Sequence, residues 1–170
     1  MHETLQMKQK LPFILLIAAG LLIVFSFYGK ALLRPDSMMF ASSGDGLKNY
    51  FTYSYHIRHD SAAVSFEGMN YPYGEHIMYT DCHPVAALLL RSLSGPFPFI
   101  AGYSVGMLNF LMILSVFLTF IVVYLLLAEF GINRWIGLIF SVGITLLAPQ
   151  IFRLGGHLAL SYSLAIPVSW

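Results

Sequence analysis

An uncharged run near the N-terminus limits what this chain can fold into more than any other feature. The run extends from Leu11 to Gly29 and lies between Lys10 and Lys30. As an α-helix it would span about 30 Å, the thickness of the hydrocarbon core of a bilayer. The pattern therefore predicts a membrane-spanning helix over residues 11–29. A cleaved signal peptide is the alternative, but Phe25-Ser26-Phe27-Tyr28 lacks the small residues that cleavage requires.

A second uncharged stretch, between Arg91 and Glu129, is too long for a single crossing. Gly95-Pro96-Phe97-Pro98 divides it, because proline cannot continue a helix. The sequence therefore predicts a short interfacial helix at about 84–93, which begins with a proline, and a second crossing at 100–128.

A third crossing is predicted at 135–152, joined to the second by a short turn so that the two form an antiparallel hairpin. Residues 158–170 are apolar again, interrupted by Pro167, and predict the start of a fourth crossing. Because a half-crossed helix would leave backbone polar groups unpaired in lipid, we expect the chain to be the N-terminal part of a longer protein.

The composition agrees with this reading, since 58% of the residues are apolar and only 10% are charged. The predicted fold class is an all-α integral membrane protein, a multi-pass helical bundle with a long folded outer loop containing short interfacial helices. A net charge of +1 leaves no broad basic face for nucleic acid. The lone Cys82 excludes a disulfide-stapled secreted fold.

The positive residues guide the predicted topology only weakly. By raw count they would place the loop over residues 30–98 inside the cell, but the counting rule applies to loops shorter than about sixty residues. We therefore predict a cytoplasmic N-terminus over residues 1–10, with the long loop on the outer side of the cell membrane.

This loop carries most of the acidic residues and is long enough to be functional. Six of the eight carboxylates lie in it: Asp36, Asp45, Asp60, Glu67, Glu75 and Asp81. Its many aromatic residues argue against disorder. A helix is predicted at about 47–60, with one face formed by Leu47, Tyr50, Phe51, Ser54 and Ile57.

Asp45 stands between Gly44 and Gly46, at or just before the start of this helix. One interpretation is an N-cap, which would stabilise the helix by roughly 1 kcal/mol. The other is functional, because flanking glycines allow a ligand to approach the carboxylate, as a general base or a hydroxyl or metal ligand requires.

Further along the loop, Tyr71 and Tyr73 lie in a segment rich in glycine and proline. They belong either to an ordered turn or to a flat surface that stacks on a sugar or an acceptor, or sits among lipid headgroups.

Asp81, or Glu75, is the candidate for a second acid beside Asp45, where the pair could position a hydroxyl or a divalent cation. No cofactor is required by the sequence. A transition-metal site is disfavoured, since the histidines have poor ligand spacing, and His56 and His59 beside Asp60 are typical of a solvated helix face. Cys82 is expected to be a small buried residue.

Arg153 and His157 flank a glycine pair at the end of the third crossing, on the side predicted for the long loop. Arg153 either extends to lipid headgroups or, with His157, binds a phosphate, for which guanidinium geometry is well suited.

The order of these motifs resembles the GT-C superfamily of polytopic membrane glycosyltransferases, of a bacterial, uncharacterised type. The resemblance rests on Gly44-Asp45-Gly46-Leu47-Lys48-Asn49, Asn70-Tyr71-Pro72-Tyr73-Gly74-Glu75 and Gly156-His157-Leu158, and it covers most of the chain. These motifs are short, so their order relative to the crossings carries the comparison.

The resemblance implies transfer of a sugar from a polyprenyl-phosphate carrier to an acceptor at the outer membrane face. It implies that Asp45 acts as the base or orients the acceptor hydroxyl, and that Arg153 and His157 hold the carrier phosphate. Family members have more crossings than this chain, so the chain alone is expected to be inactive. The alternatives are a non-catalytic multi-pass membrane protein, either part of a transporter or a lipid-binding scaffold, and a small membrane-anchored interaction module.

Overall fold

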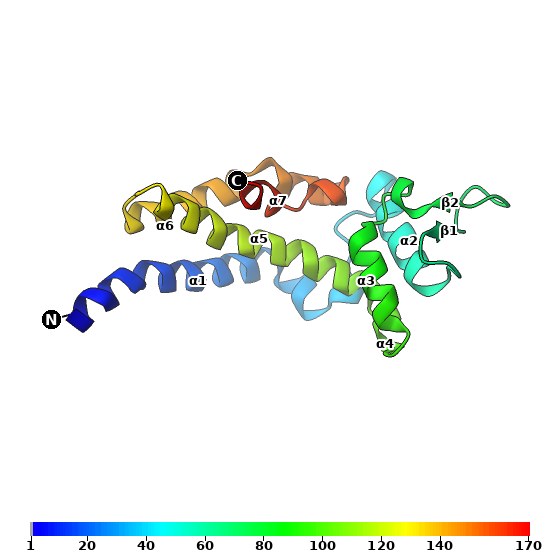
Figure 1. The fold of residues 1–170 in the computed structure, drawn as a ribbon, viewed down its shortest axis with the longest axis horizontal. Coiled ribbons are helices and arrows are strands. Elements are labelled where there is room, and N and C mark those ends of the chain that lie inside the picture. The colour runs from blue at the N-terminus through cyan, green and yellow to red at the C-terminus, as the bar shows by residue number, and fades with distance from the viewer. Residues whose placement is uncertain (1) are drawn as a thin grey trace.

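The computed structural model describes the backbone of residues 2–170 and the side chains from Lys10 onward. The predicted N-terminal segment 1–10 therefore lies almost wholly outside the described side chains. The described chain is 71% helical, with a single two-stranded sheet. Three helices run side by side along the length of the molecule, and the shorter elements gather at one end (Figure 1).

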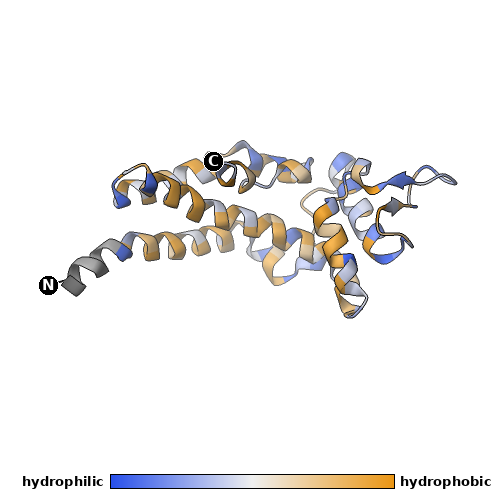
Figure 2. Cartoon of the chain, in the orientation of Figure 1, coloured by the Kyte–Doolittle hydropathy of each residue, from blue (hydrophilic) through white to orange (hydrophobic). Residues whose placement is uncertain are grey.

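The three long helical segments carry the hydrophobic character of the chain. Helix α1 is His2–Leu33, α5 is Ser104–Glu129 and α6 is Arg134–Leu147. The segments Lys10–Leu33, Ser104–Glu129 and Arg134–Gly155 are each long and apolar enough to cross a membrane. Figure 2 shows apolar residues along these helices and polar residues at the two ends of the molecule. The prediction of a helical protein with three long apolar segments is confirmed at this level.

The turn between α5 and α6 explains why the two helices lie side by side. The amide of Ile132 donates to the carbonyl of Leu127 at 3.0 Å, and that of Gly131 donates to Ala128 at 3.1 Å. Gly131 adopts a φ of +75°, which glycine takes without steric cost. The side chain of Asn133 then accepts from the amide of Trp135 and starts α6.

The third apolar segment is not a continuous α-helix over the predicted range 135–152. Helix α6 ends at Leu147, and a 3-10 helix, η3, follows over Pro149–Gly155. The cause is Pro149, since the residue before a proline avoids the α conformation, and Ala148 is extended with a ψ of 126°.

The C-terminal segment also differs from the predicted start of a fourth helix at 158–170. It contains a 3-10 helix, η4, at Leu158–Leu160 and a four-residue helix, α7, at Ala165–Val168. Hydroxyl groups anchor it to α5: Thr119 and Ser163 share a hydrogen bond of 2.9 Å, and the Ser115 hydroxyl accepts from the amide of Leu164 at 3.1 Å. The second bond satisfies the amide of Leu164, which a regular helix would have paired internally.

Residues 35–103 form a small domain at one end of the bundle, here called the head. Its elements are η1 (Pro35–Ser37), α2 (Gly44–Arg58), β1 (Ser65–Phe66), β2 (Glu75–His76), η2 (Ile77–Tyr79), α3 (Pro84–Ser94) and α4 (Phe99–Gly102). The strands are antiparallel, with Ser65 opposite His76 and Phe66 opposite Glu75. In Figure 1 the head lies at the end of the molecule away from the N-terminus.

Asn109 of α5 holds the head against the long helices. Its side-chain nitrogen donates to the carbonyls of Pro35 at 2.8 Å and Met38 at 2.7 Å, and its oxygen accepts from the Tyr50 hydroxyl. Asn109 is 1% exposed, so losing any of these partners would leave a polar group buried without a hydrogen bond.

The buried face of α2 differs from the predicted one. Leu47 and Phe51 are 44% and 45% exposed, whereas His56 is fully buried. His56 Nδ1 lies 2.6 Å from Asp60 Oδ2, and the side chains of both are inaccessible to solvent. Arg91 of α3 contacts His56 Nε2 at 3.5 Å and donates to the carbonyl of Ala62. The prediction that His56 and Asp60 form a solvated face was therefore wrong, because α3 and the loop after α2 cover them.

Candidate functional site

Asp45 lies in the first turn of α2 rather than at its cap. The helix begins at Gly44, and Ser43 occupies the N-cap position, where its side chain makes no capping hydrogen bond. The N-cap interpretation of Asp45 was therefore wrong. Its carboxylate is 61% exposed, and Oδ2 lies 3.7 Å from Nδ1 of His157, which is 52% exposed. The structure thus joins two residues that the sequence singled out from distant segments.

A close backbone approach makes this pairing geometrically feasible. A Cβ atom placed on Gly46 would lie 2.2 Å from Ala41 Cβ and 3.1 Å from the carbonyl oxygen of Gly156. Only a residue without a side chain allows the first turn of α2 to lie this close to the segment that precedes His157.

Lys48 and Asp81 form a second ion pair on the same helix. Lys48 follows Asp45 by three residues, so the two share one side of α2. Lys48 Nζ lies 3.2 Å from Asp81 Oδ2, with 37% and 57% of the two side chains exposed. Such a surface pair stabilises the fold by only about 0–1 kcal/mol. We call Asp45, Lys48, Asp81 and His157 the polar cluster.

The other predicted polar residues lie outside these two pairs. Arg153 is exposed on η3, and its side chain forms no hydrogen bond or ion pair with any residue that the structure describes. Glu75 is half-buried on β2 and is likewise without a side-chain partner among the described residues.

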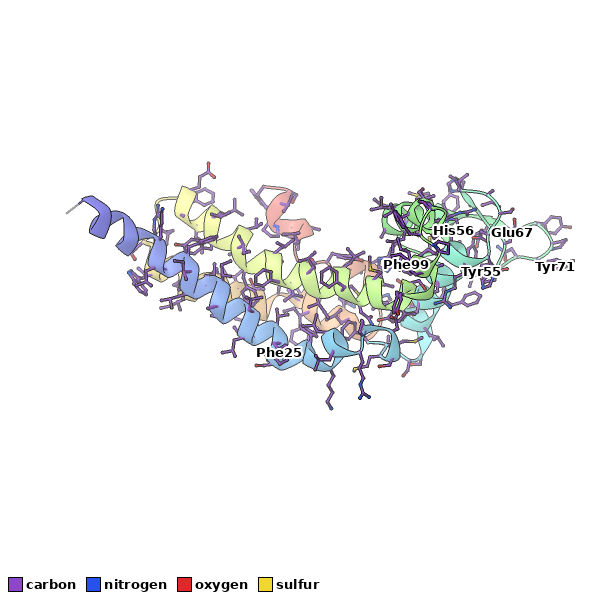
Figure 3. All side chains as sticks on the ribbon, turned by 90° about the horizontal axis from the view of Figure 1, so that it is seen from below. Phe25, Tyr55, His56, Glu67, Tyr71 and Phe99 are labelled. Atoms are coloured by element: carbon purple, nitrogen blue, oxygen red, sulfur yellow. The ribbon has the colours of Figure 1, made fainter. Side chains whose placement is uncertain are left out.

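Tyr71 and Tyr73 lie at the tip of the loop that joins β1 and β2. Each is 92% exposed, and the tip is closed by hydrogen bonds from the amides of Tyr73 and Gly74 to the carbonyl of Asn70. In Figure 3 Tyr71 lies at the extreme end of the head. The tip is an ordered turn, as one of the two interpretations expected.

Sequence reasoning missed Asn49 and His83, which hydrogen bonds connect to the backbone of Asp45. The side-chain nitrogen of Asn49 donates to the backbone carbonyl of Asp45 at 2.7 Å, and its oxygen lies 3.2 Å from Nε2 of His83. Burial lowers the pKa of His83 to about 4, although the negative charge of Asp81 acts in the opposite direction. The imidazole is therefore neutral at physiological pH.

His83 also lines an apolar groove of about 640 Å³. Its walls are formed by α3, by α5 and by the segment after η3, including Leu89, Leu111, Ala159 and Tyr162. The rings of His83 and Tyr162 lie 5.6 Å apart in an edge-to-face arrangement. Burial raises the pKa of Tyr162 to about 12, so its phenol is also neutral.

The part of the chain that the structure describes contains no preformed metal site. No group of three or more His, Cys, Asp or Glu side chains there is placed to hold a metal ion. Cys82 is fully buried, as predicted, and burial raises the pKa of its thiol.

The fold and the site define a predominantly helical protein with three helices that could cross a membrane and an acid-bearing polar cluster at one end. The chain belongs to the family described as domain of unknown function DUF6311, whose model matches residues 17–166. The match includes the whole polar cluster, His83 and the groove. No curated protein and no solved structure matches the chain.

Proposed function

We propose that this chain carries the acceptor-activating base of a GT-C type membrane glycosyltransferase, which moves a sugar from a polyprenyl-phosphate carrier to an acceptor hydroxyl. The observation that supports this proposal best is the exposed carboxylate of Asp45, in the first turn of α2, paired with His157. A carboxylate open to solvent, in a chain with three long apolar helices, suits a reaction on a sugar carried by a membrane lipid.

In the proposed reaction Asp45 accepts the proton of the acceptor hydroxyl. The acceptor oxygen forms a bond to the anomeric carbon of the sugar while the bond from that carbon to the phosphate oxygen breaks, and the phosphate leaves with the electron pair. A single base with direct displacement inverts the anomeric centre. His157, 3.7 Å from the carboxylate, can orient Asp45 for this role.

Arg153 and His157 are proposed to bind the carrier phosphate and to neutralise the charge that develops on it. The exposure of both residues, and the freedom of the Arg153 side chain from other described partners, support this role. Lys48 adds a positive charge on the same side of α2, although it is engaged with Asp81. Tyr71 and Tyr73, well exposed, are proposed to contact the acceptor.

We also propose that the head lies on the outer side of the cell membrane and that the N-terminus is cytoplasmic. The head gathers most of the acidic residues at one end of the three long helices, which supports a polar domain at a membrane surface (Figure 2). A divalent cation is not required for this reaction, although the carboxylate of Asp45 is a suitable ligand for one.

The decisive test is Asp45→Asn, in the complete gene product in its native membrane. The variant keeps the size of the side chain but removes its basicity, so transfer of radiolabelled sugar from a polyprenyl-phosphate donor should fall by at least 100-fold, the lower range for general-base catalysis, which is about 10² to 10⁴. Glu129→Gln is the matched control, since Glu129 is exposed at the far end of α5. Unchanged transfer in Asp45→Asn would reject the catalytic role and favour a non-catalytic lipid-binding scaffold or transporter part.

A further inference from the structure

We propose that the groove between α3 and α5 binds a membrane amphiphile with a free hydroxyl, and that Nδ1 of His83 accepts the hydrogen bond from this hydroxyl. This site goes beyond the proposed function, because it binds a lipid alcohol through its hydroxyl and takes no part in the proton transfer to Asp45. No part of it depends on the phosphate-binding residues.

The hydrogen-bond network fixes the tautomer of His83. The side chain of Asn49 must direct its nitrogen to the carbonyl of Asp45, because that oxygen can only accept. The side-chain oxygen of Asn49 is therefore left facing Nε2 of His83, at 3.2 Å, and Nε2 must donate to it. A neutral imidazole with a proton on Nε2 carries a lone pair on Nδ1.

This lone pair is available to a ligand. Nδ1 forms no hydrogen bond with any residue that the structure describes. It is also not fully buried, since the fully buried side-chain atoms without a partner in the described chain are hydroxyl oxygens of Tyr53, Tyr124 and Thr145. His83 as a whole is 8% exposed and lines the groove. A ligand in the groove would therefore lie against a residue that carries an acceptor with no described partner.

The walls of the groove define the chemistry of its occupant. Val85 and Leu93 of α3, with Met107 and Leu111 of α5, are apolar, and none of the described residues that line the groove is charged. An anionic headgroup would be left without a partner there and would also be repelled by the Nδ1 lone pair. An alcohol matches both features, because its hydroxyl donates to Nδ1 and its hydrocarbon chain covers the walls. Since α5 is one of the three helices apolar enough to cross a membrane, such a ligand would enter from lipid.

The backbone around His83 supports a specific role for the side chain. His83 has a φ of +53°, in the left-handed region that residues other than glycine rarely adopt. A pKa of about 4 keeps Nδ1 unprotonated across the physiological range.

The first experiment uses the unmodified chain, labelled with ¹⁵N-histidine in detergent micelles. The chain has six histidines, so the His83 signals can be assigned from their loss in a His83 variant. Farnesol is the probe, and farnesyl methyl ether is the matched control, since it has the same chain without a hydroxyl donor. We expect farnesol to shift the Nδ1 resonance and the ether to leave it in place. Equal shifts with both compounds, or none with farnesol, would overturn the proposal.

Two substitutions separate the acceptor from the structural bond. In His83→Gln the side-chain nitrogen can replace Nε2 and still donate to Asn49, but nothing replaces Nδ1. In His83→Asn the side-chain oxygen lies near the former Nδ1 and can accept, while the bond to Asn49 is lost. The dissociation constant for farnesol should rise about tenfold in His83→Gln and less than threefold in His83→Asn, as expected for the loss of one hydrogen bond.

A purely structural role for His83 predicts the reverse order, with His83→Gln binding farnesol normally and His83→Asn binding it poorly. Helical circular dichroism monitors folding of both variants. If one fails to fold, the comparison of farnesol with its ether in the unmodified chain still decides. Farnesol binding is measured independently of sugar transfer. Farnesol binding without sugar transfer would support the lipid-alcohol site and contradict the glycosyltransferase function. Sugar transfer without farnesol binding would contradict the lipid-alcohol site alone.

Discussion

Gly46 lies so close to Gly156 that a Cβ atom on Gly46 would be 3.1 Å from the carbonyl oxygen of Gly156. This contact joins the first turn of α2 to the segment after η3, and it holds Asp45 and His157 within reach of each other. The polar cluster thus depends on a residue that carries no functional group.

The substitution Gly46→Ala should separate the two segments. The added methyl group would meet Ala41 Cβ at 2.2 Å, so the backbone must shift, and overpacking of this kind lowers the free energy of unfolding by about 1–3 kcal/mol. Thermal unfolding in micelles would measure the loss. Gly102→Ala is the control, because a Cβ there would meet no atom within 4 Å. Equal melting temperatures for the two variants would show that Gly46 is not tightly packed against Ala41 and Gly156.

The pKa of His83 predicts a loss of stability in weak acid. Its pKa falls from 6.5 in a model peptide to about 4 in the folded protein, so between these values the unfolded chain binds a proton that the folded one does not. Above pH 6.5 His83 is neutral in both states and does not lower the free energy of unfolding. As the pH falls from 6.5 towards 4, the free energy of unfolding decreases by up to about 3 kcal/mol. Melting temperatures of the unmodified chain and His83→Gln between pH 7.5 and about pH 4.5 would test this. The difference between the two should depend on pH, and parallel curves would contradict the assignment.

The proposed topology predicts opposite labelling of the two ends of the molecule. A cysteine at Tyr71, on the tip of the head, should react with a membrane-impermeant maleimide on intact cells, whereas one at Phe130 should react only after permeabilisation. Both positions are well exposed, at 92% and 79%. Native Cys82 is fully buried and should stay silent, which the unmodified chain verifies. Labelling of the Phe130 cysteine in intact cells, with no labelling of the one at Tyr71, would show that the topology is the reverse of the proposed one.

The long helices were predictable because their signal is local. A run such as Leu11 to Gly29 needs no tertiary information, and Pro96 and Pro98 mark where α3 gives way to α4 and α5. The break at Ala148 was also readable in principle, since Pro149 follows it directly. It was missed because hydropathy alone set the limits of the third segment.

The candidate site was predictable only in part. Asp45 and His157 were chosen from their glycine-rich surroundings, and the structure pairs them. His56 and Asp60 have the four-residue spacing of a helical pair, a signal that was available and not used. By contrast, nothing local marks His83, whose bond to Asn49 joins residues far apart in the sequence.

The three hydrogen bonds of Asn109 have a mechanical consequence. They clamp both Tyr50 of α2 and the connection around Pro35 to one point on α5. The head is therefore tied to that helix at one buried point, and a change in the tilt of α5 would carry α2, with Asp45 in its first turn, along with it.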